Sequence, residues 1–506
     1  MGTILTFDIG TTAIKTCLFD ETLKLLKKRT DEYNLTDEDG LIELESEVYW
    51  ETICHAVSTI GDGELLKTVE AICLTTQGET LIPVDRKGTP LHRAIVWLDN
   101  RAESQSEEIR KRIPREEVYR LTGVTDINGF VPLAKLLWFK EKRPEIYKNT
   151  YKFLLLEDFL LYRLTGRFVT EKSLLTSTGY YDIRHDCYWE ELLDMIGLEA
   201  EKLPKILDCG QQAGALHKRA AMELGLSEDA KVFAGAMDQI AAAIGGGGMR
   251  EGVVTATIGT ALVLTSAIPS MDDCSDSSLI LYRGIKEGQY AILPLCSTAG
   301  AVFKWFKDQF CQWEIEECGR EGTDIYDKLC AYAKEVPAGA KGVLLLPYFA
   351  GSFQPLYIPE AKGVFFGLGV TSDKKVLVRA VLESIGYMLR ENLEMLRKFG
   401  ISIKRLHFFG GGSKNMIWNQ IIADIADVEL ALPEQEECAS FGAAVLGAVS
   451  MGWYESVEEA QDCNSVRRIV RPDPLKKDIY DKIYARYKKL LNSVMPIFEE
   501  IKGEDG

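Results

Sequence analysis

The sequence has little of what several classes of protein require. It contains only 5 histidines, and its 12 cysteines form no Cys-x-x-Cys pair, so it offers neither zinc-ligand spacing nor a disulfide framework. It also lacks an excess of basic residues. The net charge of -17 argues against nucleic acid or an anionic membrane as partner, because both are bound through clustered Lys and Arg.

Long apolar segments are absent as well. No run of about 18 apolar residues occurs, and no basic segment followed by an apolar core opens the chain. We therefore expect a cytoplasmic protein with reduced thiols, no nucleic-acid partner and no membrane association. Hydrophobic residues make up 46% and charged residues 27% of the 506 positions, which is ordinary for a globular protein with room for several domains.

The most informative segment lies near the start, at Asp8-Ile9-Gly10-Thr11-Thr12. Apolar runs flank it, which predicts a strand, a tight glycine turn and a second strand. Gly10 lets backbone amides close on a phosphate, and the hydroxyls of Thr11 and Thr12 add donors. Asp8 can hold Mg²⁺ through its bound waters. Such turns also occur in plain hairpins, so this segment alone leaves both interpretations open.

A second copy of this pattern occurs about half a chain later. Residues 254–264 repeat the strand, the Gly-Thr turn at Gly259 and the second strand, with Thr257 in the position of Asp8. The repeat suggests two related α/β domains that hold a nucleotide phosphate tail between their turns. A run of four glycines at 245–248 indicates the boundary and a hinge, so we expect domains at 1–245 and 246–506.

Polar residues follow two predicted strands of the first half. Residues 69–74 lead into Gln77-Gly78-Glu79-Thr80, and residues 94–97 lead into the segment that contains Asp99 and Arg101. Ligands of α/β domains gather at the carboxyl ends of strands, so Gln77, Glu79, Asp99 and Arg101 are candidates for a substrate pocket. The alternative for Asp99 is that it caps the following helix.

Asp238 is the strongest catalytic candidate. It follows a predicted strand at 231–237 and precedes a stretch of small residues that predicts a helix. A carboxylate at this point can accept the proton of an attacking hydroxyl. It can equally cap the helix, and sequence spacing does not separate the two interpretations.

A second glycine turn lies in the other half, at Gly410-Gly411-Gly412. It joins a predicted strand ending at Phe409 to a predicted helix over 416–426. It lacks the ending of a P-loop and the spacing of a dinucleotide fingerprint, so it suits adenosine better than pyrophosphate. Between the two turns, apolar residues spaced by three and four over 378–396 predict a long amphipathic helix whose apolar stripe belongs to the core.

Taken together, these motifs resemble the FGGY carbohydrate kinases, a family within the wider sugar-kinase, actin and Hsp70-type ATPase fold. The resemblance covers nearly the whole chain. It rests on the Asp8 to Thr12 turn, Trp97-x-Asp99-x-Arg101, Leu164-Thr165-Gly166, residues 235–239, Ile258-Gly259-Thr260, Gly300, residues 361–368 and the 410–412 turn with Asn415. It implies an α/β fold of two actin-like, ribonuclease H-like ATPase domains, with a nucleotide and substrate cleft between them.

The resemblance also implies roles for individual residues, with ATP and Mg²⁺ as cofactors. Asp238 would be the catalytic base and Asp8 would organise Mg²⁺. The implied ATP-binding residues are Thr11, Thr12, Lys15, Gly259, Thr260, Gly300, Gly411, Gly412 and Asn415, with Lys15 replacing an arginine of the glycerol kinase branch. The implied substrate-binding residues are Gln77, Gly78, Glu79, Asp99, Arg101, Phe130, Asp238 and Gln239.

The substrate segment departs from the patterns of the family's branches. Gly78 stands where glycerol kinases carry an arginine, and Phe130 replaces their tyrosine, whereas Trp418 and residues 438–444 look closer to xylulokinases and gluconokinases. An aldonate would bring its charge close to Glu79 and Asp238. We therefore expect a neutral sugar or polyol, first a pentulose such as xylulose, with glycerol, erythritol or a pentitol as alternatives.

A function of another class stays open at this point. The same fold serves non-catalytic ATP-binding regulators, which need no base at the position of Asp238. Related kinases are often dimers, so a homodimer is an alternative to a monomer, and no surface in the sequence decides between them.

Overall fold

The computed structural model describes residues 2–61, 63–268, 270–271, 279–352, 354–356 and 358–501. The chain forms two compact units. The first comprises Met1–Met249, Ile268–Ile292 and Glu437–Asn464, and the second comprises Arg250–Ala267, Leu293–Glu436 and Ser465–Gly506. The sequence predicts one break, near residue 245. The compact units also divide near that point, but two later segments return to the first unit.

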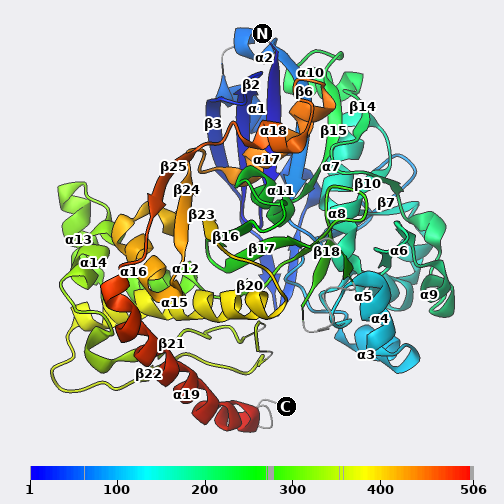
Figure 1. The fold of residues 1–506 in the computed structure, drawn as a ribbon. Helices are drawn as coiled ribbons and strands as arrows, with labels where there is room; N and C mark the ends of the chain where they lie inside the picture. Colours follow the sequence, from blue (N-terminus) through cyan, green and yellow to red (C-terminus); the bar gives the residue numbers. More distant parts are fainter. Residues whose placement is uncertain are drawn as a thin grey trace. The chain divides into compact units, whose positions relative to one another are not determined.

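A six-stranded sheet forms the centre of the first unit (Figure 1). Its order is β14 (Gln212–Ala215), β15 (Lys231–Met237), β6 (Val69–Thr76), β1 (Thr3–Ile9), β2 (Ala13–Asp20) and β3 (Leu25–Glu32). β1 runs antiparallel to β2 and parallel to β6, and β15 runs parallel to β6. The carboxyl ends of β1, β6 and β15 therefore meet at one edge, where Asp8, Gln77 and Asp238 stand.

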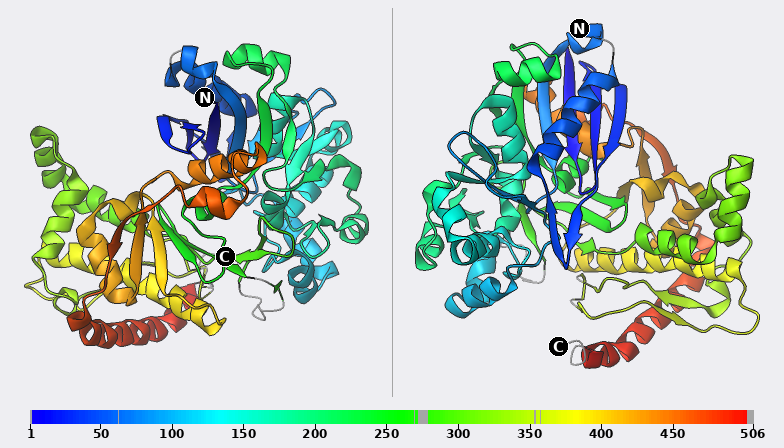
Figure 2. Two further views of the ribbon diagram at one scale, coloured as in Figure 1. Left: turned by 45° about the horizontal axis from the view of Figure 1, so that its top comes forward. Right: turned by 180° about the vertical axis from the view of Figure 1, so that it is seen from behind.

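Helices cover both faces of this sheet. α17 (Cys438–Ser450) packs on β1, β6 and β15, and α1 (Ser46–Ile60), in front in the rear view of Figure 2, packs on β2 and β3. α7 (Leu156–Thr165) joins α1 in a buried core with the sheet. The other helices of the unit are α2 (Gly63–Leu66), α3 (Glu103–Arg112), α4 (Arg115–Thr122), α5 (Pro132–Lys142), α6 (Pro144–Asn149), α8 (Lys172–Leu175), α9 (Glu190–Met195), α10 (Lys218–Leu224), α11 (Asp238–Gly245) and α18 (Val457–Gln461).

Glycines explain why the late segment returns to the first unit. α11 and α17 pack backbone to backbone: a Cβ at Gly442 would lie 1.9 Å from the Ala241 carbonyl oxygen, and one at Gly245 would lie 1.9 Å from that of Cys438. Such an approach excludes any side chain. Gly245, expected at a hinge, is therefore a packing residue at the end of α11.

The strand expected over 94–97 is shorter than predicted and lies outside the main sheet. β8 (Ala94–Ile95) belongs to a five-stranded sheet with β4 (Thr36–Glu38), β5 (Leu41–Leu44), β7 (Leu81–Val84) and β9 (Lys152–Leu155). Its pairings are antiparallel, so Asp99 and Arg101 do not follow a parallel strand of the central sheet. Smaller separate pairs are β10 (Val169–Glu171) with β13 (Lys205–Leu207) and β11 (Tyr181–Asp182) with β12 (Cys187–Tyr188). β18 (Leu281–Arg283) runs antiparallel to β19 (Tyr290–Ile292).

The second unit repeats the hairpin arrangement of the first. β16 (Val254–Ile258) runs antiparallel to β17 (Leu262–Ile268) and parallel to β23 (Arg405–Phe409). β24 (Glu429–Pro433) and β25 (Val466–Val470) continue beyond β23, and β20 (Leu295–Cys296) pairs with β17. The second Gly-Thr turn is thus a true counterpart of the first. β21 (Leu344–Leu346) and β22 (Val364–Phe366) form a separate pair.

The helices of the second unit confirm two expectations. The long amphipathic helix is α15 (Lys374–Lys398), and the helix after the glycine turn is α16 (Met416–Ala426), preceded by the 3-10 turn η5 (Gly411–Lys414). The remaining helices are α12 (Gly300–Phe310), α13 (Gln312–Glu321), α14 (Ile325–Lys334) and α19 (Lys477–Ile501). Within the described part of the chain, none of the helices combines the length and apolar character needed to cross a membrane.

Candidate active site

The first Gly-Thr turn is held in place by two aromatic residues. The Trp97 indole N–H donates to the Thr11 hydroxyl at 3.0 Å, and the Tyr33 hydroxyl donates to the Gly10 carbonyl. The backbone N–H of Tyr33 also bonds the carbonyl of Thr12 at 2.9 Å. These contacts fix the turn's backbone and leave the Thr12 side chain exposed, as a phosphate-binding turn requires.

Charged side chains surround this turn. Asp8 and Lys15 face each other across the hairpin, with Lys15 Nζ 3.7 Å from Asp8 Oδ2. The same ammonium lies 3.0 Å from Glu437 Oε2, and Lys28 Nζ lies 2.6 Å from Glu437 Oε1. Burial raises the pKa of Asp8, and the charge of Lys15 opposes that effect. Glu437 lies more than 400 positions after Lys28 in the sequence, so no local pattern predicts its contact with these lysines.

The corner after β6 carries unsatisfied polar groups. The buried Gln77 amide lies beside the Tyr49 hydroxyl, yet neither group makes a hydrogen bond of acceptable geometry with any described residue. The buried Thr80 hydroxyl is also unpaired among the described residues. Glu79 between them has a left-handed backbone with φ of 55°. Because buried polar atoms are nearly always paired, this corner is suited to a ligand rich in hydroxyl groups.

Asp238 stands at the end of β15 and opens α11. Met237 occupies the cap position, so Asp238 is the first helical residue, and its carboxylate contacts the N–H of Gln239. Burial raises the pKa of Asp238 to about 7, and the nearby charges of Asp8 and Glu79 add to the shift. The carboxyl therefore titrates near neutral pH, where a general base is most effective.

Glu79 lies in an enclosed setting of its own. Burial raises its pKa, while the Ser177 hydroxyl and the ammonium of Lys135 oppose the shift. Lys135 is fully buried, donates to the Val96 carbonyl at 3.0 Å, and has its pKa lowered by burial to about 7. Tyr282 lies close enough to both Glu79 and Asp238 for their charges to raise its pKa, after burial as the main cause.

Asp99 and Arg101 are engaged with each other. Arg101 Nε and Nη2 donate to the two oxygens of Asp99 at 2.8 and 2.6 Å, and Nη1 contacts Glu43 at 2.6 Å. Asp99 also accepts the N–H of Ile42 at 2.7 Å. Asp99 does not cap α3, whose cap position is Ala102. A role for this pair in binding substrate stays a prediction and would require these atoms to exchange partners.

Two further predicted substrate residues are less enclosed. The Phe130 side chain is 37% exposed and its N–H bonds the Asn128 side chain. Gln239 is partly exposed beside Asp238. Their roles stay predictions.

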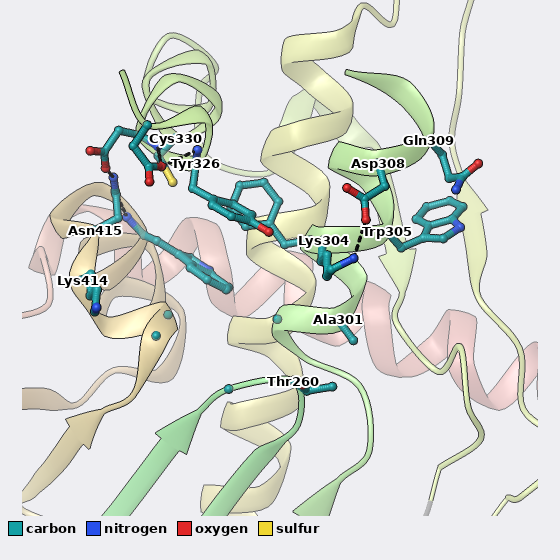
Figure 3. Close-up of a pocket in the computed structure, with 18 residues that line it drawn as sticks. Thr260, Ala301, Lys304, Trp305, Asp308, Gln309, Tyr326, Cys330, Lys414 and Asn415 are labelled. Carbon is teal, nitrogen blue, oxygen red and sulfur yellow. Dashed lines mark hydrogen bonds and ion pairs between the residues drawn. The ribbon is translucent and has the colours of Figure 1, made fainter. Parts of the chain in front are cut away.

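A cavity of about 710 Å³ lies in the second unit. Figure 3 shows Thr260 and Ala301 toward the bottom of the view, Tyr326 and Cys330 toward the top, and Asn415 and Lys414 at the side. The predicted nucleotide residues that line it are Gly259, Thr260, Gly300, Gly411, Gly412 and Asn415. The structure therefore brings residues from three distant segments into one pocket.

Gly300 ties the Gly-Thr turn to the start of α12. Its N–H bonds the Gly259 carbonyl at 3.0 Å, and the N–H groups of Ala299 and Ala301 bond the Thr260 carbonyl at 2.9 and 3.1 Å. A Cβ at position 300 would lie 2.3 Å from the Gly259 carbonyl oxygen, so only glycine fits. The turn and the helix N-terminus form one rigid corner, with a helix dipole that favours an anion.

The opposite end of the cavity is aromatic. Phe303 packs edge-on against Tyr326 and Trp418, with ring centroids 5.2 and 5.5 Å apart. Asn415 caps α16 by accepting the N–H groups of Ile417 and Trp418, while its amide donates to Asp327 at 2.6 Å. A flat apolar ring fits this end, and a phosphate tail fits the other.

Family models match both halves of the chain. Residues 3–245 match the N-terminal domain and residues 255–451 match the C-terminal domain of the FGGY family of carbohydrate kinases. The chain belongs to the FGGY family of carbohydrate kinases. It is therefore an ATP-dependent phosphotransferase that acts on a carbohydrate.

Full-length relatives carry different substrate names. Gluconokinase of Bacillus subtilis is 28% identical over 461 residues, 91% of this chain and 90% of that protein. Xylulose kinase of Staphylococcus xylosus is 26% identical and covers 97% and 100% of the two chains. The structure of ligand-bound xylulose kinase from Lactobacillus acidophilus superposes with a TM-score of 0.88 at 24% identity, covering 99% and 100%, which shows the fold.

Sequence reasoning about this FGGY kinase missed several residues of both regions. Lys135, Ser177 and Tyr282 reach Glu79 from segments without a recognised motif, and Tyr326 reaches the 710 Å³ cavity in the same way. The sequence does hold one signal, since Lys135 is a charged residue on the otherwise apolar face of α5. A lysine is almost never fully buried without a reason.

Proposed function

We propose that this FGGY kinase transfers the γ-phosphoryl group of ATP to a hydroxyl of a small neutral sugar, a pentulose such as xylulose. The observation that carries the proposal is the setting of Asp238. A carboxyl with a pKa of about 7 lies at the same sheet edge as the unpaired polar groups of Gln77 and Thr80. A base poised near neutral pH beside groups that lack partners is what a polyhydroxyl acceptor requires.

Asp238 would accept the proton of the attacking hydroxyl as the new O–P bond forms. Glu79, Gln77 and Gln239 would orient the other hydroxyls, because carboxylates and amides supply the acceptors and donors that a sugar needs. The protein's contribution is then mainly positioning and charge stabilisation, as in phosphoryl transfer generally.

The second unit would bind ATP. In this assignment the corner of Gly259, Thr260 and Gly300 contacts the phosphates, and Gly411, Gly412 and Asn415 lie at the adenosine end. Thr11, Thr12 and Lys15 of the first unit would face the transferred group, since the turn's backbone is fixed, the Thr12 side chain is exposed, and the Thr11 hydroxyl accepts from Trp97 and keeps its own hydrogen to donate.

Asp8 fits the requirement of Mg²⁺. It is an enclosed carboxylate at a turn with two hydroxyl side chains, and Mg²⁺ commonly uses one or two carboxylates together with substrate phosphates. Bound there, the ion would neutralise charge on the phosphates of ATP. Lys15, which now pairs with Asp8 and Glu437, would share that task.

The choice of acceptor rests on charge. Relatives named gluconokinase and xylulose kinase match this chain about equally well, so their names favour neither acceptor. Burial raises the pKa of both Glu79 and Asp238, and a sugar carboxylate beside them would add like charge. Lys135 is the one observation that favours gluconate, but its ammonium already faces Glu79 and Asp99.

The test is an ADP-release assay with Mg-ATP against xylulose, ribulose, glycerol, erythritol, xylitol, arabitol and gluconate. We expect fast, acceptor-dependent release with a pentulose. Fast release with gluconate or glycerol alone would overturn the acceptor assignment. If no sugar of the panel stimulates ADP release while ATP still binds, the result would favour a non-catalytic ATP-binding regulator.

Asp238→Asn is the companion variant. It keeps the size of the side chain and removes the proton acceptor, so we expect ADP release to fall to near background while ATP binding, measured by calorimetry, stays unchanged. Near-normal turnover of this variant would show that Asp238 is not the base.

A further inference from the structure

The strand that delivers Asp238 is irregular just before it ends. The pairing of β15 with β6 shifts register between Phe233 and Ala236, which places a bulge at Gly235. A Cβ at Gly235 would lie 1.5 Å from the Leu74 carbonyl oxygen, so the two backbones touch there. Bulges next to active sites re-aim the side chains that follow them, and here that side chain is Asp238.

Two backbone N–H groups at the bulge are held by buried side chains. The N–H of Gly235 donates to Glu157 Oε1 at 2.9 Å, and the N–H of Met237 donates to Ser173 Oγ at 3.0 Å. Both side chains are fully buried. Met237 directly precedes Asp238, so the second bond fixes the peptide that sets the direction of the carboxylate.

Ser173 is itself held by a buried acid. Its hydroxyl donates to Glu171 Oε1 at 2.8 Å, and its own N–H donates to Glu171 Oε2 at 2.5 Å. Glu171 also accepts the N–H of Leu174 at 2.6 Å and the Cys209 thiol at 3.0 Å. With its hydrogen committed to Glu171, the Ser173 oxygen can only accept from Met237.

Glu157 supplies the second anchor. Burial raises its pKa well above the ordinary value, and the neighbouring charge of Glu171 adds to the shift. Its Oε1 takes the Gly235 N–H, while Oε2 has no hydrogen-bond partner among the described residues. The role that the contacts show for Glu157 is therefore to place an acceptor oxygen on the backbone N–H of the bulge.

We propose that Ser173 and Glu157, with Glu171 behind Ser173, are positioning residues for Asp238: they hold the bulged end of β15 so that the carboxylate meets the acceptor hydroxyl. This proposal rests on the proposed role of Asp238 as base. It adds three residues that touch neither substrate nor nucleotide in that mechanism and that act only through the backbone of Gly235 and Met237.

The test compares Ser173→Ala and a pair at position 157, Glu157→Gln and Glu157→Met. The acceptor is xylulose, or whichever panel sugar the wild type turns over fastest. Gln keeps the oxygen that accepts the Gly235 N–H, whereas Met keeps only the volume. We expect kcat to fall by roughly ten- to a hundredfold in Ser173→Ala and Glu157→Met, with little change in the KM of sugar or ATP and near-wild-type kcat in Glu157→Gln.

Ser106→Ala is the matched control. Ser106 is equally buried in the same unit, but its hydroxyl bonds the Glu103 carbonyl at 2.7 Å within α3, away from β15. Each kcat is divided by the number of sugar-binding sites per chain measured by calorimetry. A sample that is partly unfolded is then not mistaken for a slow enzyme. The control is expected to keep wild-type kcat per binding site.

The outcomes separate the two proposals. Ser173→Ala and Glu157→Met with wild-type kcat per site, alongside an inactive Asp238→Asn, would overturn the positioning role and leave the base in place. Equal losses in Glu157→Gln and Glu157→Met would also overturn it, because retention of the acceptor would then make no difference. An active Asp238→Asn would instead remove the proposed function on which the inference rests.

Discussion

At the scale of the residue, three carboxyl groups are the candidates for the chemistry of this kinase. Asp238, Glu79 and Asp8 lie near one another at the edge of the first sheet, and burial raises the pKa of each. The charges of Asp8 and Glu79 also raise the pKa of Asp238, so the three carboxyls together resist full ionisation. A neutral acceptor avoids adding to that cost.

The proposed base, Asp238, predicts how turnover depends on pH. A base must be deprotonated to act, and a pKa of about 7 leaves most of the enzyme protonated below that value. We expect kcat/KM for the sugar to fall about tenfold per pH unit below about pH 6.5 and to level off above about pH 7.5. Direct quantification of ADP across this range measures it. A flat profile down to about pH 5 would contradict the assignment.

The second feature at the scale of the residue is the space beside Gly78. A Cβ built on Gly78 would lie 3.4 Å from Ser177 Oγ and 3.7 Å from Met237 Sδ, which is ordinary contact. The backbone therefore tolerates Ala, while a long side chain would have to enter the space beside Glu79. We expect Gly78→Arg to raise the KM for a pentulose by roughly tenfold or more, and Gly78→Ala to leave it nearly unchanged. Equal values for both variants would show that the acceptor does not use this space.

At the scale of the element, the corner between the second Gly-Thr turn and α12 is the proposed binding point for the phosphates of ATP. A methyl group at position 300 would collide with the Gly259 carbonyl and push the turn away from the helix N-terminus. We expect Gly300→Ala to weaken ATP binding by roughly ten- to a hundredfold without changing sugar binding, both measured by calorimetry.

Gly319→Ala is the control for that substitution. Gly319 lies within α13, and a Cβ there would meet nothing within 4 Å. Ala is favoured over Gly inside a helix by about 0.5–1 kcal/mol, so this variant should be slightly more stable than the wild type and bind ATP normally. Equal ATP affinities of Gly300→Ala and Gly319→Ala would show that the corner at Gly300 does not contribute to ATP binding.

Elements with a strong local pattern were predictable and those that depend on partners were not. The strand over 231–237 and the helix over 416–426 have the bounds expected from the sequence, because apolar content and flanking glycines define them locally. The strand at 94–97 is shortened to two residues, because its hydrogen-bond partners belong to a small antiparallel sheet. Pairing of this kind depends on residues distant in sequence.

At the scale of the whole molecule, each compact unit carries its own set of candidate binding residues. The predicted sugar residues belong to the first unit, and those that line the 710 Å³ cavity belong to the second. Each ligand should therefore stabilise the unit that binds it.

Hydrogen exchange tests whether each ligand stabilises the unit that binds it. A non-hydrolysable ATP analogue alone should protect backbone amides around 259–260, 300–301 and 411–415, and the sugar alone should protect those around 77–80 and 238–239. The six-stranded sheet provides an internal reference, since its strand β1 is buried throughout and β6 is buried at every position except Glu70. Protection of 77–80 by the ATP analogue alone would contradict the division of binding between the units.

The sequence by itself determined the two Gly-Thr hairpins, the strand that ends just before Asp238 and the glycine turn before α16, because each is specified by a few adjacent residues. Only the tertiary structure decided which distant side chains join them. Glu437 reaches Lys15, Lys135 reaches Glu79, and Glu157 and Ser173 reach the backbone before Asp238. The physical reason is that burial and charge pairing act through space, while local sequence patterns report only what neighbours along the chain can do.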